Sequence, residues 1–179
     1  MKDSSIEKHN SLAGFLCGVV LWIIAFLMSG ESDIIDTVIL YDTGRLPLLF
    51  PVVFSAAVIA AGIYSVKSND FAFFKGFSIP AIIIICSFGL SSLYSLHEMF
   101  EYGNSSMVIE IIISLMLIIA IPFSGILNRI DEEIYYLSNS DAFIIFSYVL
   151  VLLVVIVPFI VTAVVVHKKR KVVESSHEK

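Results

Sequence analysis

The sequence has few of the residues on which catalytic and metal sites depend. The two cysteines, Cys17 and Cys86, each lie inside a different apolar run, which favours buried free thiols over a disulfide or a metal pair. The four histidines are spread along the chain, at positions 9, 97, 167 and 177. No stretch resembles a phosphate-binding glycine loop, a nucleophile elbow or an H-E-x-x-H motif. We therefore expect a protein that is not an enzyme and that holds no metal or other cofactor.

Charge is also scarce, and it lies almost entirely between long apolar runs. Only 15% of the 179 residues are charged, whereas 58% are hydrophobic and the mean hydropathy is +0.95. A chain this apolar is not an ordinary soluble domain. The first apolar run lacks a cleavage site of A-x-A type, so we expect it to stay rather than to be removed as a signal peptide. The predicted organisation is a polar segment at 1–11, a membrane domain at 12–166 and a basic polar tail at 167–179.

Five apolar runs have lengths that suit a membrane crossing. They lie near residues 12–28, 46–66, 77–96, 107–127 and 142–166. A helix rises about 1.5 Å per residue, so about 20 residues cross the roughly 30 Å hydrocarbon core. The prediction is an all-α integral membrane protein, a bundle of about five transmembrane helices. Four crossings with one re-entrant or interfacial segment remain the alternative.

Small residues on the first two runs predict close helix packing. Gly14 and Gly18 form a G-x-x-x-G pair, which creates a groove for a neighbouring helix. A second small-residue face, at i and i+4 spacing, consists of Ala56, Ala57, Ala60, Ala61 and Gly62. Both faces are predicted to pack against partner helices.

Three further stretches are predicted to lie at the membrane boundary. Residues 68–76 are expected to form a short turn, whose phenylalanines would belong to an aromatic belt together with Phe77. Residues 31–42 and 128–141 are acidic and carry apolar residues at helical spacing, which indicates segments lying in the interface.

The candidate ionisable residues each allow two interpretations. Glu110 lies inside an apolar run, where a carboxylate is a functional candidate by default, yet it is close enough to the start of the run to reach the headgroups. His97 and Glu101, at i and i+4, suit either a metal or proton site or a solvated helix end. Arg45 lies at the entrance of the second run. Serines at 87, 91, 92 and 95 favour hydrogen bonds within or between helices over a polar path.

The basic residues leave the membrane orientation open. With five crossings, one side holds Lys2, Lys8, Lys67, Lys75 and Arg129, and the other holds Arg45, Lys168, Lys169, Arg170, Lys171 and Lys179. Five against six is no bias. With four crossings the basic tail joins the amino-terminal side and the asymmetry becomes clear. The tail is too short to indicate nucleic acid, and anionic lipid explains it more simply.

Two stretches resemble a known family. SLAGFLCGVVLWIIAFLMSG, followed by TGRLPLLFPVVFSAAVIAAGIYSVKSND, is similar to the first two helices of the small membrane subunit of tripartite tricarboxylate transporters. The matching residues are Gly44, Arg45, Pro47 and Pro51 at the entry to the second helix. The later part of the chain departs from the family, which usually has four helices and a late glycine-rich segment.

The resemblance implies a function. The chain would be a non-catalytic small subunit in the bacterial cytoplasmic (inner) membrane, beside a larger permease that works with an extracytoplasmic solute-binding protein to import carboxylates. Gly14, Gly18, Arg45, Pro47 and Pro51 would then be structural or docking residues. Two other classes remain open: a self-assembling channel lined by the serine face and Glu110, and an immunity or regulatory protein that binds one membrane partner and transports nothing.

Overall fold

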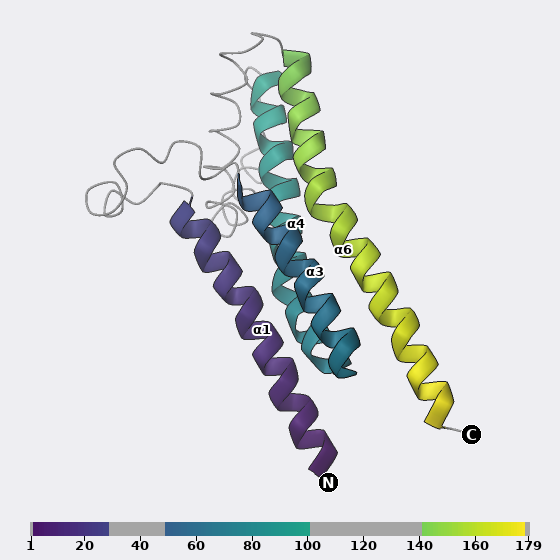
Figure 1. The fold of residues 1–179 in the computed structure, drawn as a ribbon. Helices are drawn as coiled ribbons and strands as arrows, with labels where there is room; N and C mark the ends of the chain where they lie inside the picture. The colour runs from purple at the N-terminus through teal and green to yellow at the C-terminus, as the bar shows by residue number, and fades with distance from the viewer. Residues whose placement is uncertain (1, 29–48, 101–140, 178–179) are drawn as a thin grey trace. The chain divides into compact units, whose positions relative to one another are not determined.

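The computed structural model describes residues 2–28, 49–100 and 141–177, and these fold into four long α-helices. They are α1 (Lys2–Met28), α3 (Phe50–Ser68), α4 (Phe71–Phe100) and α6 (Asp141–His177), as Figure 1 shows. Each is long and apolar enough to cross a bilayer. The predicted all-α membrane fold is therefore confirmed. The predicted run at 107–127 and the two acidic interfacial segments lie outside the described residues, apart from Asp141.

Polar residues at the start of α1 and at the end of α6 extend these helices beyond the apolar runs from which they were predicted. The polar residues before the first run contain no glycine or proline, and α1 includes them from Lys2 onward. The basic tail likewise continues α6 to His177. The 37 residues of α6 correspond to about 55 Å, well over the roughly 30 Å hydrocarbon core, so part of this helix must lie outside it.

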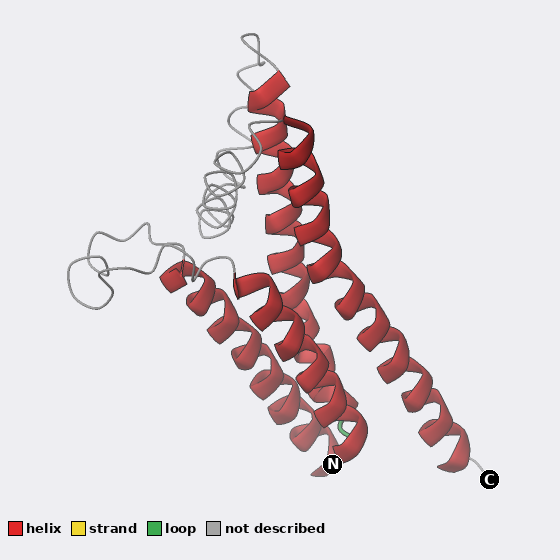
Figure 2. Cartoon of the chain, turned by 45° about the horizontal axis from the view of Figure 1, so that its top comes forward, coloured by secondary structure: helices red, strands yellow, loops and turns green. Residues whose placement is uncertain are grey.

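The turn predicted over 68–76 is wrong, because only Asn69 and Asp70 separate α3 from α4. Figure 2 shows this short loop between the two helices. Asn69 has a φ of 53°, and the N–H of Asp70 donates to the carbonyl of Ser65 at 3.1 Å, which closes the end of α3. A carboxylate oxygen of Asp70 then accepts the N–H of Phe73 at 3.4 Å and caps the start of α4. Two residues thus end one helix and begin the next.

The described helices divide between two compact units. The first comprises Met1–Trp22, Pro51–Ile83 and Val154–Lys179, and the second comprises Ile23–Phe50 and Ile84–Leu153. In the second unit the buried rings of Phe50 and Phe88 stack with centroids 6.0 Å apart. The candidate site lies entirely in the first unit.

Contacts in the first unit fix the direction of each helix. Ser11 and Gly18 of α1 meet Gly76 and Pro80 of α4 respectively, so these two helices are parallel. On α3, Ser55 and Gly62 meet Val154 and Thr162 of α6, so this pair is also parallel. The tight turn makes α3 and α4 antiparallel. The start of α1, the α3–α4 turn and the end of α6 therefore lie at one end of the unit, as Figure 1 shows.

Aromatic side chains form much of the core of this unit. Phe74 and Phe77 are almost completely buried, and the ring of Phe74 lies 6.4 Å from those of both Phe77 and Phe159. The prediction that they belong to an aromatic belt is therefore wrong for these two residues. They were assigned to the boundary because the sequence places them near Lys75. In the structure Phe74 packs against Phe159 of α6, and Phe77 lies where α4 approaches Gly14 and Gly18 of α1, so both rings gain apolar contact inside the protein.

The outer face of α6 is apolar and exposed. Its exposed side chains include Val157, Ile160, Val161 and Val164, and little of its most apolar stretch is buried within the protein. An exposed apolar surface of this extent is stable in hydrocarbon and not in water. This face contacts the lipid bilayer.

Candidate functional site

Glycines allow α1 and α4 to approach each other closely. A Cβ on Gly14 would clash with the carbonyl oxygen of Phe73, and one on Gly18 would clash with the ring of Pro80. From the other side, Gly76 lies against the backbone of Ser11. Backbones this close leave no space for a larger side chain between them. The G-x-x-x-G pair of α1 lies against α4 within the same chain.

The small residues of α3 divide between a buried and an exposed surface. Ala61 and Gly62 are buried, and a Cβ on Gly62 would clash with the methyl group of Thr162 on α6. Ala57 is half-buried, whereas Ala56 and Ala60 are exposed. One part of the predicted face is therefore used inside the chain, and the other part is open.

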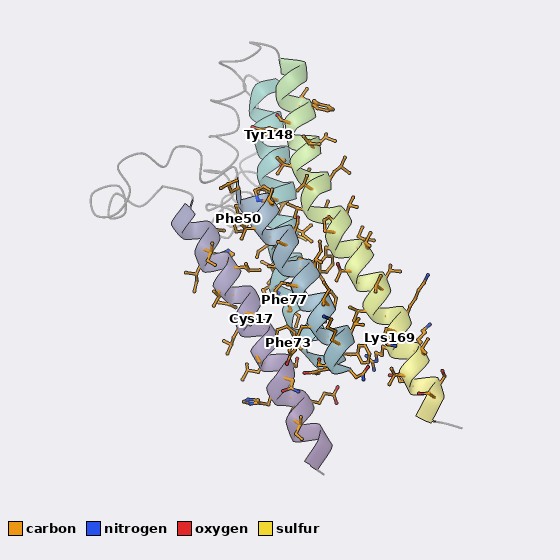
Figure 3. The ribbon with its side chains drawn as sticks, viewed as in Figure 1. Cys17, Phe50, Phe73, Phe77, Tyr148 and Lys169 are labelled. Atoms are coloured by element: carbon orange, nitrogen blue, oxygen red, sulfur yellow. The ribbon has the colours of Figure 1, made fainter. Side chains whose placement is uncertain are left out.

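Ala57 and Ala60, together with the edge of Ala61, line an apolar groove of about 330 Å³ in the first unit. It is lined by Cys17 and Leu21 from α1, by Ala57, Ala60, Ala61 and Tyr64 from α3, and by Phe73 and Phe77 from α4. Figure 3 labels Cys17, Phe73 and Phe77 on neighbouring helices. The short alanine side chains keep the groove hollow, while the rings of Tyr64 and Phe73, with centroids 4.8 Å apart, form a wall. We define these eight residues as the α1–α3 groove.

A polar contact between α3 and α6 was not predicted from the sequence. The Ser55 hydroxyl lies 2.6 Å from the carbonyl oxygen of Val154 and 2.8 Å from that of Pro51. Four residues after Val154 comes Pro158, which has no N–H to donate to it. The sequence alone shows that Pro158 leaves the carbonyl of Val154, four residues earlier, without its helical donor. It does not show which side chain donates to that carbonyl instead.

A charged pocket of about 420 Å³ lies at the end of the unit where α1 starts. Its lining includes Glu7 and Asn10 of α1, Asp70 and Lys75 beside the turn, and Arg170 and Glu174 of α6. Arg170 Nε donates to Glu174 Oε1 at 2.7 Å, but both side chains are more than half exposed, so the pair adds little stability. This pocket was missed because the sequence left the position of the basic tail open.

The predicted ionisable residues lie outside the part of the chain whose side chains the structure describes. Arg45, Glu101 and Glu110 are in segments that the structure does not describe. For His97, in α4, only the backbone is described. Ser92 is buried and donates to the carbonyl of Phe88 at 2.9 Å, a bond within its own helix. Among the described residues, no three His, Cys, Asp or Glu side chains come close enough to hold a metal ion.

Both cysteines are free, but the prediction that they are buried is wrong. Cys17 and Cys86 are exposed on the surface of α1 and α4. An apolar run predicts an apolar environment, and here that environment is the exterior of the protein rather than its core. Cys17 lines the α1–α3 groove and Cys86 does not.

Comparison of the chain with known protein families, with characterised proteins and with solved structures finds no match. The class of protein is set by the fold itself: a helical integral membrane protein. What distinguishes its described surface is the apolar groove between α1 and α3.

Proposed function

We propose that this protein is a non-catalytic small subunit of a carboxylate transporter and that the α1–α3 groove holds a helix of a larger permease. The observation that carries the proposal is the groove itself, which is apolar, open and lined by three alanines. In a bilayer, helices associate where small residues let them approach closely, because lipid tails are as apolar as the side chains they would replace. A groove lined by alanines allows such a close approach.

The position of the groove also supports this proposal. All of its lining residues from α1 and α3 lie within the two stretches that resemble the transporter family. Gly14 and Gly18 already pack against α4, so they act as internal packing residues and do not contact a partner. The partner surface would instead be formed by Cys17, Ala57 and Ala60.

The complex would lie in a bacterial cytoplasmic membrane, where an extracytoplasmic solute-binding protein delivers the carboxylate to the permease. In such a complex the small subunit performs no chemistry of its own. Its contribution would be to stabilise the permease, and its loss would reduce uptake through loss of the complex.

Purification of the full chain from native membranes tests this proposal. The protein would be tagged after Lys179, expressed at its native level, extracted in a mild detergent and analysed by mass spectrometry. We expect a multi-span permease in near-stoichiometric amount, and reduced carboxylate uptake in cells that lack the chain. Recovery of the chain only as a defined oligomer of itself, with uptake unchanged, would contradict the proposal and favour a channel.

A further inference from the structure

Every lysine and arginine that the structure describes lies at one end of the first unit. They occur in the first turns of α1, beside the α3–α4 turn and in the last turns of α6. The set, which we call the basic end, consists of Lys2, Lys8, Lys67, Lys75, Lys168, Lys169, Arg170 and Lys171. The chain has 11 basic residues, so these eight are most of them.

The three segments lie at the same level along the unit. Glu7, Asp70 and Glu174, one from each segment, line the same charged pocket. The basic residues next to them therefore lie at one shared end of the helices. Figure 3 labels Lys169 on the part of α6 at this end.

The basic end carries a strong charge excess. The same segments contain four acidic residues, Asp3, Glu7, Asp70 and Glu174. Eight basic against four acidic residues give a formal charge of +4, although the whole chain has −5. Among the described residues the only ion pair at this end joins Arg170 and Glu174. The ammonium groups of Lys8, Lys67, Lys75, Lys168, Lys169 and Lys171 are on exposed side chains.

We propose that the basic end faces the cytoplasm and binds the headgroups of anionic phospholipids in the inner leaflet. Basic residues next to membrane spans are retained on the cytoplasmic side. Lysine side chains extend along a helix and place their ammonium groups among lipid phosphates. This inference is independent of the proposed function, since it holds whether or not the chain has a permease partner.

The binding surface is the outside of the basic end rather than the charged pocket. The pocket is lined by three carboxylates, those of Glu7, Asp70 and Glu174, against the cations of Lys75 and Arg170, so it does not favour an anion. The exposed lysines of α6 have no carboxylate partner among the described residues. Lys168, Lys169 and Lys171 therefore supply the largest uncompensated group of charges.

The lipid preference is tested on the full chain in nanodiscs that contain equal amounts of phosphatidylglycerol and phosphatidylcholine. Native mass spectrometry then measures which lipid stays bound when the protein is released from the nanodisc. We expect at least a threefold excess of phosphatidylglycerol, and its loss when Lys168, Lys169 and Lys171 are all replaced by Gln. Replacement of the same three residues by Arg keeps the charge and should keep the excess. Equal retention of both lipids by the wild-type chain, or an excess that survives the Gln replacements, would overturn the inference.

The orientation is tested separately in cells. A Ser176→Cys substitution, in a chain with Cys17→Ser and Cys86→Ser, places one thiol at an exposed position near the end of α6. A membrane-impermeant maleimide should label it only after the cells are permeabilised. Labelling in intact spheroplasts would show that the basic end faces outward, which contradicts the proposal.

Discussion

The hydroxyl of Ser55 reaches the carbonyl oxygen of Val154 at 2.6 Å, and this carbonyl is the one that Pro158 leaves without a backbone donor. In a helix, the Pro51 carbonyl receives the N–H of Ser55, so the hydroxyl proton is best placed on Val154. Proline is tolerated inside membrane helices where a serine or threonine satisfies the freed carbonyl. Ser55 therefore both joins α3 to α6 and lets α6 continue through Pro158.

Replacement of Ser55 by Ala should destabilise the protein by about 1 kcal/mol, because the part-buried Val154 carbonyl then loses its donor. The free energy of unfolding is measured in mixed micelles of a mild detergent and dodecyl sulfate, with circular dichroism as the readout. In a Pro158→Ala background the backbone N–H is restored, so the same Ser55→Ala change should cost clearly less. An equal loss of stability from Ser55→Ala in the two backgrounds would show that Ser55 does not compensate for Pro158.

Ser65 provides a matched control on the same helix. Its side chain is fully buried, and its hydroxyl has no hydrogen-bond partner among the described residues. Ser65→Ala should therefore leave the free energy of unfolding unchanged or raise it slightly, because an unsatisfied polar atom is removed.

The contact between α1 and α4 predicts that glycine-to-alanine substitutions will differ strongly in their effect on stability. Gly14→Ala and Gly18→Ala force a methyl group against the Phe73 carbonyl or the Pro80 ring, and each should cost about 1–3 kcal/mol. A Cβ on Gly89 would meet no described atom within 4 Å, so Gly89→Ala should be neutral or stabilising by up to about 1 kcal/mol. The comparison of unfolding midpoints checks this, and similar losses at all three positions would argue against the packing.

The two-residue turn predicts opposite effects at neighbouring positions. Asp70→Ala removes the cap of α4 and should cost about 0.5–2 kcal/mol. Asn69 has a left-handed φ, so Asn69→Gly should be tolerated and Asn69→Val should cost more than about 1 kcal/mol. Unfolding in mixed micelles measures all three variants. A stable Asn69→Val protein would show that the turn has a different conformation.

Filling the α1–α3 groove should remove the partner without unfolding the chain. Ala60 is exposed in the groove, so Ala60→Phe occupies the hollow at little cost to the isolated protein. Co-purification of the permease should fall at least tenfold. Ile59→Phe is the control, because Ile59 is exposed on α3 but does not line the groove. Equal recovery of the permease with both variants would show that the groove does not bind it.

The sequence predicted the helices better than the surfaces they form. Hydropathy located all four described spans because burial in lipid and burial in protein select the same residues. For the same reason it did not show that Phe74 is buried and Cys17 exposed. The turn at Asn69 and Asp70 depends on backbone hydrogen bonds, and the groove depends on which helices are neighbours. Neither property is contained in the composition of a single run.

Cross-linking through the native cysteines can show whether the groove holds a permease helix. The Cys86→Ser variant keeps only Cys17, in the groove, and the Cys17→Ser variant keeps only Cys86, which is exposed elsewhere. Each is labelled in native membranes with a maleimide that carries a benzophenone and is then irradiated. We expect an adduct between Cys17 and a membrane helix of a permease, with no such adduct from Cys86. Cross-links from Cys17 only to lipid or to a second copy of this chain would contradict the proposal.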